Sequence, residues 1–233
     1  MDSYFCNDKP HSISDWSQED TSVFRKYKVP SLSLRHIIAQ PFGQLLFYEF
    51  LTKDYLIEYN LFNITDNVKI TIIGSRKMPD LLLNLWSSMV YAVNDEEPRF
   101  VRSHHYCLEN KPYFKWEAHL KKDRQYSFLH IFFPPEQLEL LTDDVQKIKS
   151  FVDCVEGLKS SVYPLEFVRT TPDMTQEMIK ILHCEVKDPE DKKAIQKKEL
   201  YLQHVTMALL IEGLDNLTRD GSRPSRRRFQ EMR

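Results

Sequence analysis

The sequence predicts an α+β fold in which a block of short strands comes first and a group of helices follows. Runs rich in β-branched and aromatic residues, separated by Asn, Asp, Pro or Gly, fill residues 29–134 and are typical of strands. Apolar residues recur at helical spacing over residues 135–218. With 42% apolar residues in a chain of 233, there is enough material for a sizeable core. Strands and helices segregated in this way favour an α+β layout over alternating β/α units.

Four segments are expected along the chain. Residues 1–28 are polar and lack periodicity, so they are expected to form an N-terminal arm. Residues 29–134 are expected to form a β-barrel or sandwich, and residues 135–218 a helical region. Residues 219–233 contain six Arg and are expected to form a basic flexible tail or linker.

The strand block contains seven clear strand-like runs and one ambiguous stretch. Residues 81–93 (LLLNLWSSMVYAV) fit either a buried helix or a pair of strands, because periodicity alone does not separate the two. The expected strands lie at residues 31–38, 44–51, 55–62, 68–73, 100–108, 113–120 and 126–133.

Capping and breaking residues mark the helices of the second block. A short helix is expected after Pro135, and a second over 143–158. A third is expected to begin after Thr171, which is a favourable N-cap with proline at the first helical position. A longer helix is expected over about 190–217.

Composition and missing motifs argue against several classes of function. There are only 5 Gly, and neither GxGxxG nor GxxxxGK[ST] occurs, which removes dinucleotide and P-loop chemistry. Lys and Arg (32) nearly balance Asp and Glu (34), unlike a free-standing nucleic-acid binder. Four scattered Cys argue against a disulfide scaffold or a structural zinc site. No secretory pattern and no apolar run of ~18 residues occurs, so a cytoplasmic protein without a membrane partner is expected.

The segment SHHYCLE at 103–109 is the best candidate for a metal site, because imidazole and carboxylate groups are metal ligands. His104 and His105 are adjacent in an expected strand, so their side chains face opposite sides and only one can enter a given pocket. A hydrogen-bonded or exposed position is favoured for both. No GxSxG motif and no recognisable Cys–His frame occurs. No catalytic residue, metal or cofactor is therefore expected.

Aromatic residues gather in the strand block and suggest a ligand cavity. A closed or nearly closed barrel of modest strand number can hold one small ligand. Such cavities are mostly apolar, with a few placed polar groups. Ordinary core packing is the alternative for any one of these residues. The pocket candidates are Tyr48, Tyr59, Trp86, His105, Tyr106 and Trp116.

The last expected helix carries two apolar stripes. One has heptad spacing and predicts pairing with a second copy of the chain, giving a homodimer. The other, Leu202, Val205 and Leu209, predicts packing on the chain's own barrel. Burial of the whole helix within one monomer is an equally open alternative. The dimer-interface candidates are Leu200, Met207, Leu210, Leu214 and Leu217.

Three segments stand in a recognisable order and spacing: YSFLHIFFPPEQLELL at 126–141, TTPDMTQEMIKILHC at 170–184 and LYLQHVTMALL at 200–210. The first is a strand that runs into a short helix, and the other two are helical. Together with the strand block before them, they resemble the regulatory domain of AraC-type transcription regulators. The resemblance covers about residues 29–217.

The resemblance implies a cupin-like β-barrel that senses an unknown small-molecule effector, followed by a helical dimerisation layer. An effector would shift the barrel or the N-terminal arm between two arrangements. The helix-turn-helix units of that family have no counterpart in these 233 residues, so the chain is expected to be a truncated regulator or a stand-alone sensor. DNA would then be reached only through a module outside the chain. Two alternatives stay open: a cupin-type metal-dependent enzyme using His104 or His105, and an interaction protein whose barrel holds no ligand.

Overall fold

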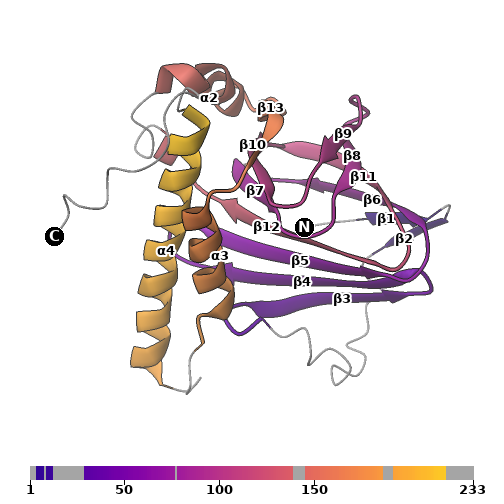
Figure 1. Cartoon of the computed structure of the whole chain (residues 1–233), viewed down its shortest axis with the longest axis horizontal. Coiled ribbons are helices and arrows are strands. Elements are labelled where there is room, and N and C mark those ends of the chain that lie inside the picture. Colours follow the sequence, from indigo (N-terminus) through magenta and orange to yellow (C-terminus); the bar gives the residue numbers. More distant parts are fainter. Residues whose placement is uncertain are drawn as a thin grey trace.

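A computed structural model describes residues 4–7, 9–12, 29–76, 78–138, 145–185 and 191–218. Two antiparallel β-sheets enclose a barrel-like body, and helices lie along one flank of it (Figure 1). Strands dominate the first part of the chain and helices the last part, so the predicted α+β class is confirmed.

The inner sheet has seven strands in the order β13-β10-β7-β12-β5-β4-β3. All neighbouring strands in it are antiparallel. One of its faces turns to the other sheet and the opposite face turns to the helices. Its strands are β3 (Ser33–Gln40), β4 (Gly43–Leu51), β5 (Leu56–Ile64), β7 (Asp80–Asn84), β10 (His105–Asn110), β12 (Arg124–Phe132) and β13 (Ser161–Arg169).

The outer sheet has six strands in the order β2-β1-β6-β11-β8-β9. The expected arm at 1–28 contributes the hairpin β1–β2, and β1 pairs with β6, while residues 13–28 lie outside the described part. The ambiguous stretch 81–93 forms strands, one in each sheet. The strands are β1 (Tyr4–Asn7), β2 (Lys9–Ser12), β6 (Val68–Ser75), β8 (Met89–Val93), β9 (Arg99–Val101) and β11 (Tyr113–Leu120).

The helices are η3 (Val145–Ile148), α2 (Lys149–Glu156), α3 (Pro172–His183) and α4 (Lys192–Thr218). The expected cap of α3 is confirmed, because the Thr171 hydroxyl accepts a hydrogen bond of 3.1 Å from the Met174 backbone N–H. Figure 1 shows α3 and α4 side by side. Most of the short helix expected after Pro135, and the whole tail at 219–233, lie outside the described residues.

Strand β13 was not expected, because residues 135–218 were predicted to be helical throughout. This strand returns to the inner sheet and pairs with β10. Its sequence, SVYPLEFVR, has the β-branched and aromatic residues of a strand. Its internal proline fits the position at the edge of the sheet, where a missing N–H leaves no ladder bond unmade. The helical layer is therefore tied to the barrel by a strand of its own.

Two cores lie on opposite faces of the inner sheet. The barrel interior, between the sheets, holds Leu45, Phe62 and Phe128 of the inner sheet against Ile70 and Trp116 of the outer sheet. The helix-side core holds alternate residues of the same inner strands against α2, α3 and α4. Its largest contributors include Leu46, Tyr59, Leu83, Tyr106, Leu129, Met174, Leu209 and Leu210.

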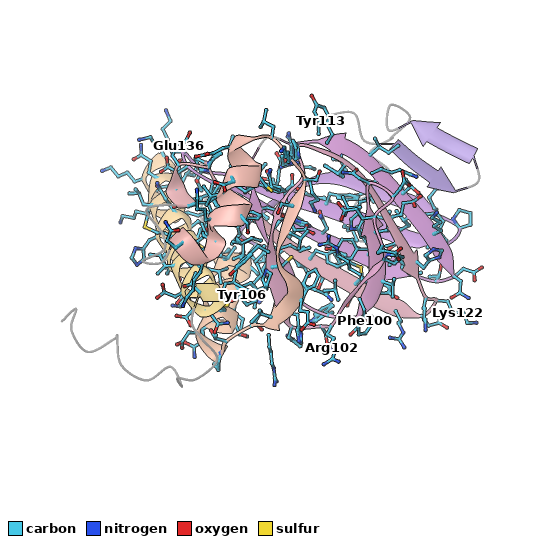
Figure 2. All side chains as sticks on the ribbon, turned by 90° about the horizontal axis from the view of Figure 1, so that it is seen from above. Phe100, Arg102, Tyr106, Tyr113, Lys122 and Glu136 are labelled. Atoms are coloured by element: carbon cyan, nitrogen blue, oxygen red, sulfur yellow. The ribbon has the colours of Figure 1, made fainter. Side chains whose placement is uncertain are left out.

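Tyr106 links the inner sheet to α4 (Figure 2). Its hydroxyl donates to the Gly213 carbonyl oxygen at 2.9 Å and accepts from the Asn216 side-chain amide at 2.9 Å. A Cβ on Gly213 would stand 3.4 Å from side-chain atoms of Leu81 and Met174, so glycine allows the helix to approach the sheet closely. None of the described helices has the length and apolarity to span a membrane.

Replacing Leu209 by Ala should lower the free energy of unfolding by about 2–5 kcal/mol, because the side chain is fully buried in the helix-side core. Ile195→Ala, at an exposed position on the same helix, should change it by less than about 0.5 kcal/mol. Chemical denaturation followed by circular dichroism measures both. Equal losses for the two variants would contradict this orientation of α4.

Candidate ligand-binding site

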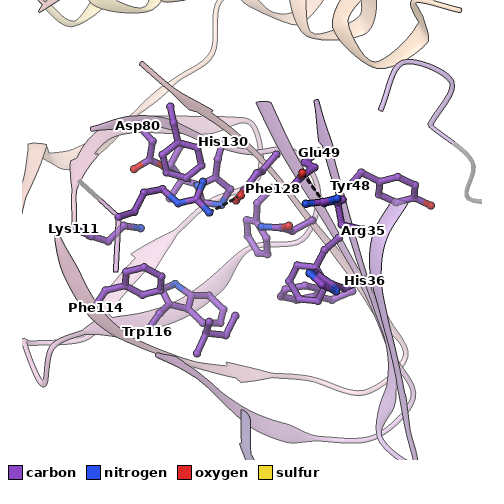
Figure 3. Close-up of a pocket in the computed structure, with 18 of the residues that line it drawn as sticks. Arg35, His36, Tyr48, Glu49, Asp80, Lys111, Phe114, Trp116, Phe128 and His130 are labelled. Atoms are coloured by element: carbon purple, nitrogen blue, oxygen red, sulfur yellow. Dashed lines mark hydrogen bonds and ion pairs between the residues drawn. The ribbon is translucent and has the colours of Figure 1, made fainter. Parts of the chain in front are cut away.

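A cavity of about 210 Å³ lies in the barrel interior, between the two sheets (Figure 3). Side chains from β3, β4, β5, β7 and β12 of the inner sheet and from β6, β8 and β11 of the outer sheet line it. These positions alternate along each inner strand, since every second residue points to the same face. Its lining divides into an aromatic floor, a polar end and a rim.

The aromatic floor consists of Phe47, Phe62, Phe128 and Trp116. Ring centroids are 5.6 Å apart for Phe47 and Phe62, 5.7 Å for Phe62 and Phe128, and 6.4 Å for Trp116 and Phe128. The last two pairs meet edge to face, which is a favoured geometry for aromatic pairs. Three of these residues sit on adjacent inner strands and Trp116 closes the set from the outer sheet, so the floor spans both walls.

The polar end consists of Glu58, Arg76, Asp80, Glu109, Lys111 and His130. Arg76 Nη2 lies 2.6 Å from Glu58 Oε1, and His130 Nδ1 lies 2.7 Å from Asp80 Oδ2. Strand register brings these groups together, because Glu58 stands opposite His130. The Arg76 guanidinium also lies 4.0 Å from the centre of the Phe132 ring, in cation–π geometry.

Lys111 and Glu109 form the most deeply buried ion pair of the polar end. Glu109 is fully buried, and it accepts hydrogen bonds from the Lys111 ammonium group and, at 2.7 Å, from the Tyr91 hydroxyl. Burial alone would lower the pKa of Lys111, but the negative charges of Glu109 and Asp80 outweigh it and raise that pKa. Lys111 therefore stays charged beside the cavity.

The rim carries a separate ion pair. Arg35 Nε lies 2.6 Å from Glu49 Oε1, and the Arg35 side chain is 58% exposed (Figure 3). Arg35 is placed there by a β-bulge between Leu34 and His36 in β3. A bulge redirects a side chain out of the regular alternation, which brings this arginine to the cavity edge.

The arrangement can bind polar groups and can also orient an imidazole. A carboxylate on Nδ1 fixes the His130 ring, as in general acid–base sites, and leaves Nε2 for a bound molecule. Burial and the charges of Glu109 and Asp80 raise the pKa of the Cys107 thiol well above its usual range, so this thiol is not a nucleophile. Within the described ranges, no three His, Cys, Asp or Glu residues are grouped to hold a metal ion.

The structure separates the six residues expected in a pocket. Tyr48 and Trp116 line the cavity, although the Tyr48 ring points away from it toward the helix side (Figure 3). Tyr59 and Tyr106 lie in the helix-side core. Their placement on the other face follows from the period of two, because both are neighbours of inward-facing residues along their strands.

The remaining two pocket candidates and His104 lie outside the cavity lining. Trp86 is 49% exposed in the turn between β7 and β8. His105 begins β10, with Nδ1 2.9 Å from the Ser103 carbonyl oxygen. His104 is exposed and has a positive φ of 58° in the turn before that strand. The three residues are therefore not brought together.

Sequence reasoning missed the charged residues of the lining. The signal that could have found them is a charged residue inside an otherwise apolar strand, as in LLFYEFL with Glu49 and LIEYNLF with Glu58. A charged group that alternates with buried apolar residues faces either water or a polar cavity. Here the opposite face carries helices, so the charges turn to the cavity.

The five dimer-interface candidates also fall into two groups. Leu210 and Leu214 are fully buried in the helix-side core, and Leu217 packs against it. Leu200 is 66% and Met207 40% exposed, and Ile211, also 40% exposed, lies on the same side of α4. The stripe expected to pair two copies is therefore split, because the wide buried face of α4 takes in three of its members.

The sequence matches no protein-family model and no curated protein. Among solved structures, the AraC-like transcriptional activator CuxR aligns at 12% identity and a TM-score of 0.39, over 83% of this chain and 66% of that one. A cupin superfamily protein from Desulfitobacterium hafniense aligns at 13% identity and a TM-score of 0.32, over 41% and 83% of the two chains. The polyketide cyclase RemF from Streptomyces resistomycificus aligns at 8% identity and a TM-score of 0.35, over 46% and 76%. Regulators and enzymes both occur among these structures, and none assigns a function to this chain.

The tyrosines around the inner sheet should make the fold sensitive to alkaline pH. Burial and then the neighbouring Tyr59 raise the pKa of Tyr48 from 10.0 to about 12, and burial also raises the pKa of Tyr55, Tyr59 and Tyr91. Because these folded-state pKa values lie above the unfolded value, the stability they give is complete below about pH 10 and lost as the pH rises toward 12.

Urea denaturation at a series of pH values from about 8 to 11 measures this loss. Tyr48→Phe should reduce the steepness of the alkaline decline, whereas Tyr113→Phe, at a residue that is 73% exposed, should leave it unchanged. An alkaline decline that is the same in both variants would contradict the role given to Tyr48.

Proposed function

We propose that this chain is a small-molecule-sensing and dimerisation unit of an AraC-type transcription regulator. The observation that carries the proposal is the cavity in the barrel, with an aromatic floor and paired charged groups, behind a sheet whose other face holds the helices. The three sequence segments that resemble this family lie on β12, α3 and α4, the elements that connect the cavity wall to the helical layer. DNA would be contacted through a module outside this chain, in the cytoplasm.

The inner sheet offers a route from the cavity to the helices. On β10, Glu109 belongs to the polar end, whereas Tyr106 and Leu108 face the helix-side core. A ligand that alters the Lys111–Glu109 pair would act on the strand that holds Tyr106 against the Gly213 carbonyl oxygen. Such a ligand shifts the position of α4 only if it binds two arrangements of the barrel with different affinity.

A second copy of the chain is the proposed partner of the exposed side of α4. Leu200, Met207 and Ile211 form one stripe, called the outer stripe, because their spacing of seven and four residues returns to the same side of a helix. Exposed apolar residues arranged in a stripe are typical of helix pairing. The heptad part of this stripe, Leu200 and Met207, is retained from the predicted interface.

A second candidate function is an enzyme that moves a proton inside the cavity. The 2.7 Å contact between His130 Nδ1 and Asp80 Oδ2 favours it, since an oriented imidazole can act as a general base. Recovery of the bound molecule separates the two functions. A sensor returns its ligand unchanged after long incubation, whereas an enzyme returns a product.

Filling the cavity should abolish the response to small molecules without unfolding the protein. Met89→Trp places a larger side chain into the cavity, whereas Val90→Trp places the same side chain on the exposed face of the same strand. We expect a compound identified by thermal-shift screening to raise the Tm of the wild type and of Val90→Trp but not of Met89→Trp. An undiminished shift in Met89→Trp would contradict binding in the cavity.

Charges on the outer stripe should dissociate a dimer. Leu200→Glu combined with Met207→Glu would bury two unpaired carboxylates in the proposed interface, which is costly. Sedimentation velocity of this variant should give a monomer at concentrations at which the wild type is a dimer. Phe100→Glu, at a residue that is 59% exposed on the outer sheet, should stay dimeric. A wild type that sediments as a monomer at every concentration would contradict the proposal.

A further inference from the structure

The charges of the polar end compensate one another. Glu58, Asp80 and Glu109 face Arg76, Lys111 and His130, and each carboxylate has one of these basic groups as its partner. With His130 neutral, the carboxylates exceed the cations by one, and with His130 protonated the two signs balance. In neither state does the polar end carry a net positive charge.

This balance disfavours an anionic ligand. A carboxylate or phosphate brought to Arg76 or Lys111 would share a cation that already holds Glu58 or Glu109. Glu109 is fully buried and Arg76 and Lys111 are largely buried, so water screens the added negative charge weakly. The rim is balanced as well, because Arg35 is paired with Glu49, and His36 adds charge there only when protonated.

The same pairs present hydrogen-bond donors beside acceptors. Glu58 contacts Arg76 through Oε1, and Asp80 contacts His130 through Oδ2, so each carboxylate has a second oxygen outside that contact. Asn60, between the floor and the polar end, has a side-chain amide that both donates and accepts. A hydroxyl group, which donates one hydrogen bond and accepts two, matches such a surface.

The aromatic floor and the volume limit the body of the ligand. Phe47, Phe62, Phe128 and Trp116 offer an apolar wall, which accommodates the C–H face of a ring. A volume of 210 Å³ corresponds to about seven water molecules, so the ligand is a small ring compound.

We propose that the cavity selects an uncharged, polyhydroxylated ring compound, with its apolar face on the aromatic floor and its hydroxyl groups on the paired charges of the polar end. The proposal rests on the ligand-sensing function given above and specifies its ligand class. Its core is the exclusion of anions by cations that already have carboxylate partners.

Matched probes test the class directly. The neutral compounds myo-inositol and methyl β-D-glucopyranoside are compared with the anions glucuronate and glucose 6-phosphate, at millimolar concentrations, by saturation-transfer NMR and calorimetric titration. We expect at least one neutral probe to bind at least about tenfold more tightly than either anion. Tighter binding of an anion, or no binding of either neutral probe, would overturn the proposal.

A charge-altering variant tests the reason for the selectivity. Glu58→Gln removes the carboxylate partner of Arg76 and makes the polar end more positive by one charge, so the preference for neutral probes over anions should fall by about tenfold. Glu117→Gln removes the partner of Lys69 at 3.0 Å on the outward face of β11 and should leave the preference unchanged. Equal preferences in the wild type and Glu58→Gln would overturn the proposal.

The failure of this proposal is distinguishable from the failure of the sensing function. If a charged compound from the thermal-shift screen binds the wild type and not Met89→Trp, the ligand class is wrong and the sensing function stands. If no compound of any charge shifts the Tm of the wild type, the sensing function fails, and the ligand class fails with it.

Discussion

The alternation of side chains along the inner sheet is the constraint on which the rest of the structure depends. On β5, Glu58, Asn60 and Phe62 line the cavity, whereas Ile57, Tyr59 and Leu61 lie in the helix-side core. One sheet therefore serves as the wall of a polar cavity and as the platform for the helices. A slip of one residue in its register would bring Glu58 under α4 and Tyr59 into the cavity, so both functions of the sheet fix the same register.

The polar end is expensive for the fold. Taking three carboxylates and their partners out of water costs free energy that their mutual attraction only partly offsets, and well-packed apolar residues of similar size would often be more stable. The polar end is nonetheless well ordered by its pairing, with Glu109 bound by both Lys111 and Tyr91. Costly polar groups with fixed positions are typical of binding sites, where local stability gives way to recognition.

Much of the fold could be predicted from the sequence, because it depends on local signals. Strand composition located most of the inner sheet, and Thr171 with Pro172 located the start of α3. Two features could not be predicted in this way. The stretch 81–93 is apolar on both faces of β7, which erases the period of two, and β13 lies among helices, so only its sheet partner reveals it.

The candidate site could be predicted only in part, because it depends on which face of each strand is inward. Aromatic content drew attention to Tyr48, Tyr59 and Tyr106, yet the rings of all three lie on the helix side, while Phe47, Phe62 and Phe128 form most of the floor. The two sets have similar composition. Only the partners across the sheet, helices on one face and a second sheet on the other, distinguish them.

Helix α4 joins the two halves of the molecule, because it carries a buried and an exposed face on one rigid element. Leu209, Leu210 and Leu214 are fixed in the helix-side core, and Tyr106 holds Gly213 near the sheet. The outer stripe is on the same helix, so any displacement of the inner sheet that moves Gly213 also moves Met207 and Ile211. A continuous helix transmits such a displacement without a chain of separate side-chain contacts, which makes the spacing between β10 and α4 the quantity that a bound ligand would have to change.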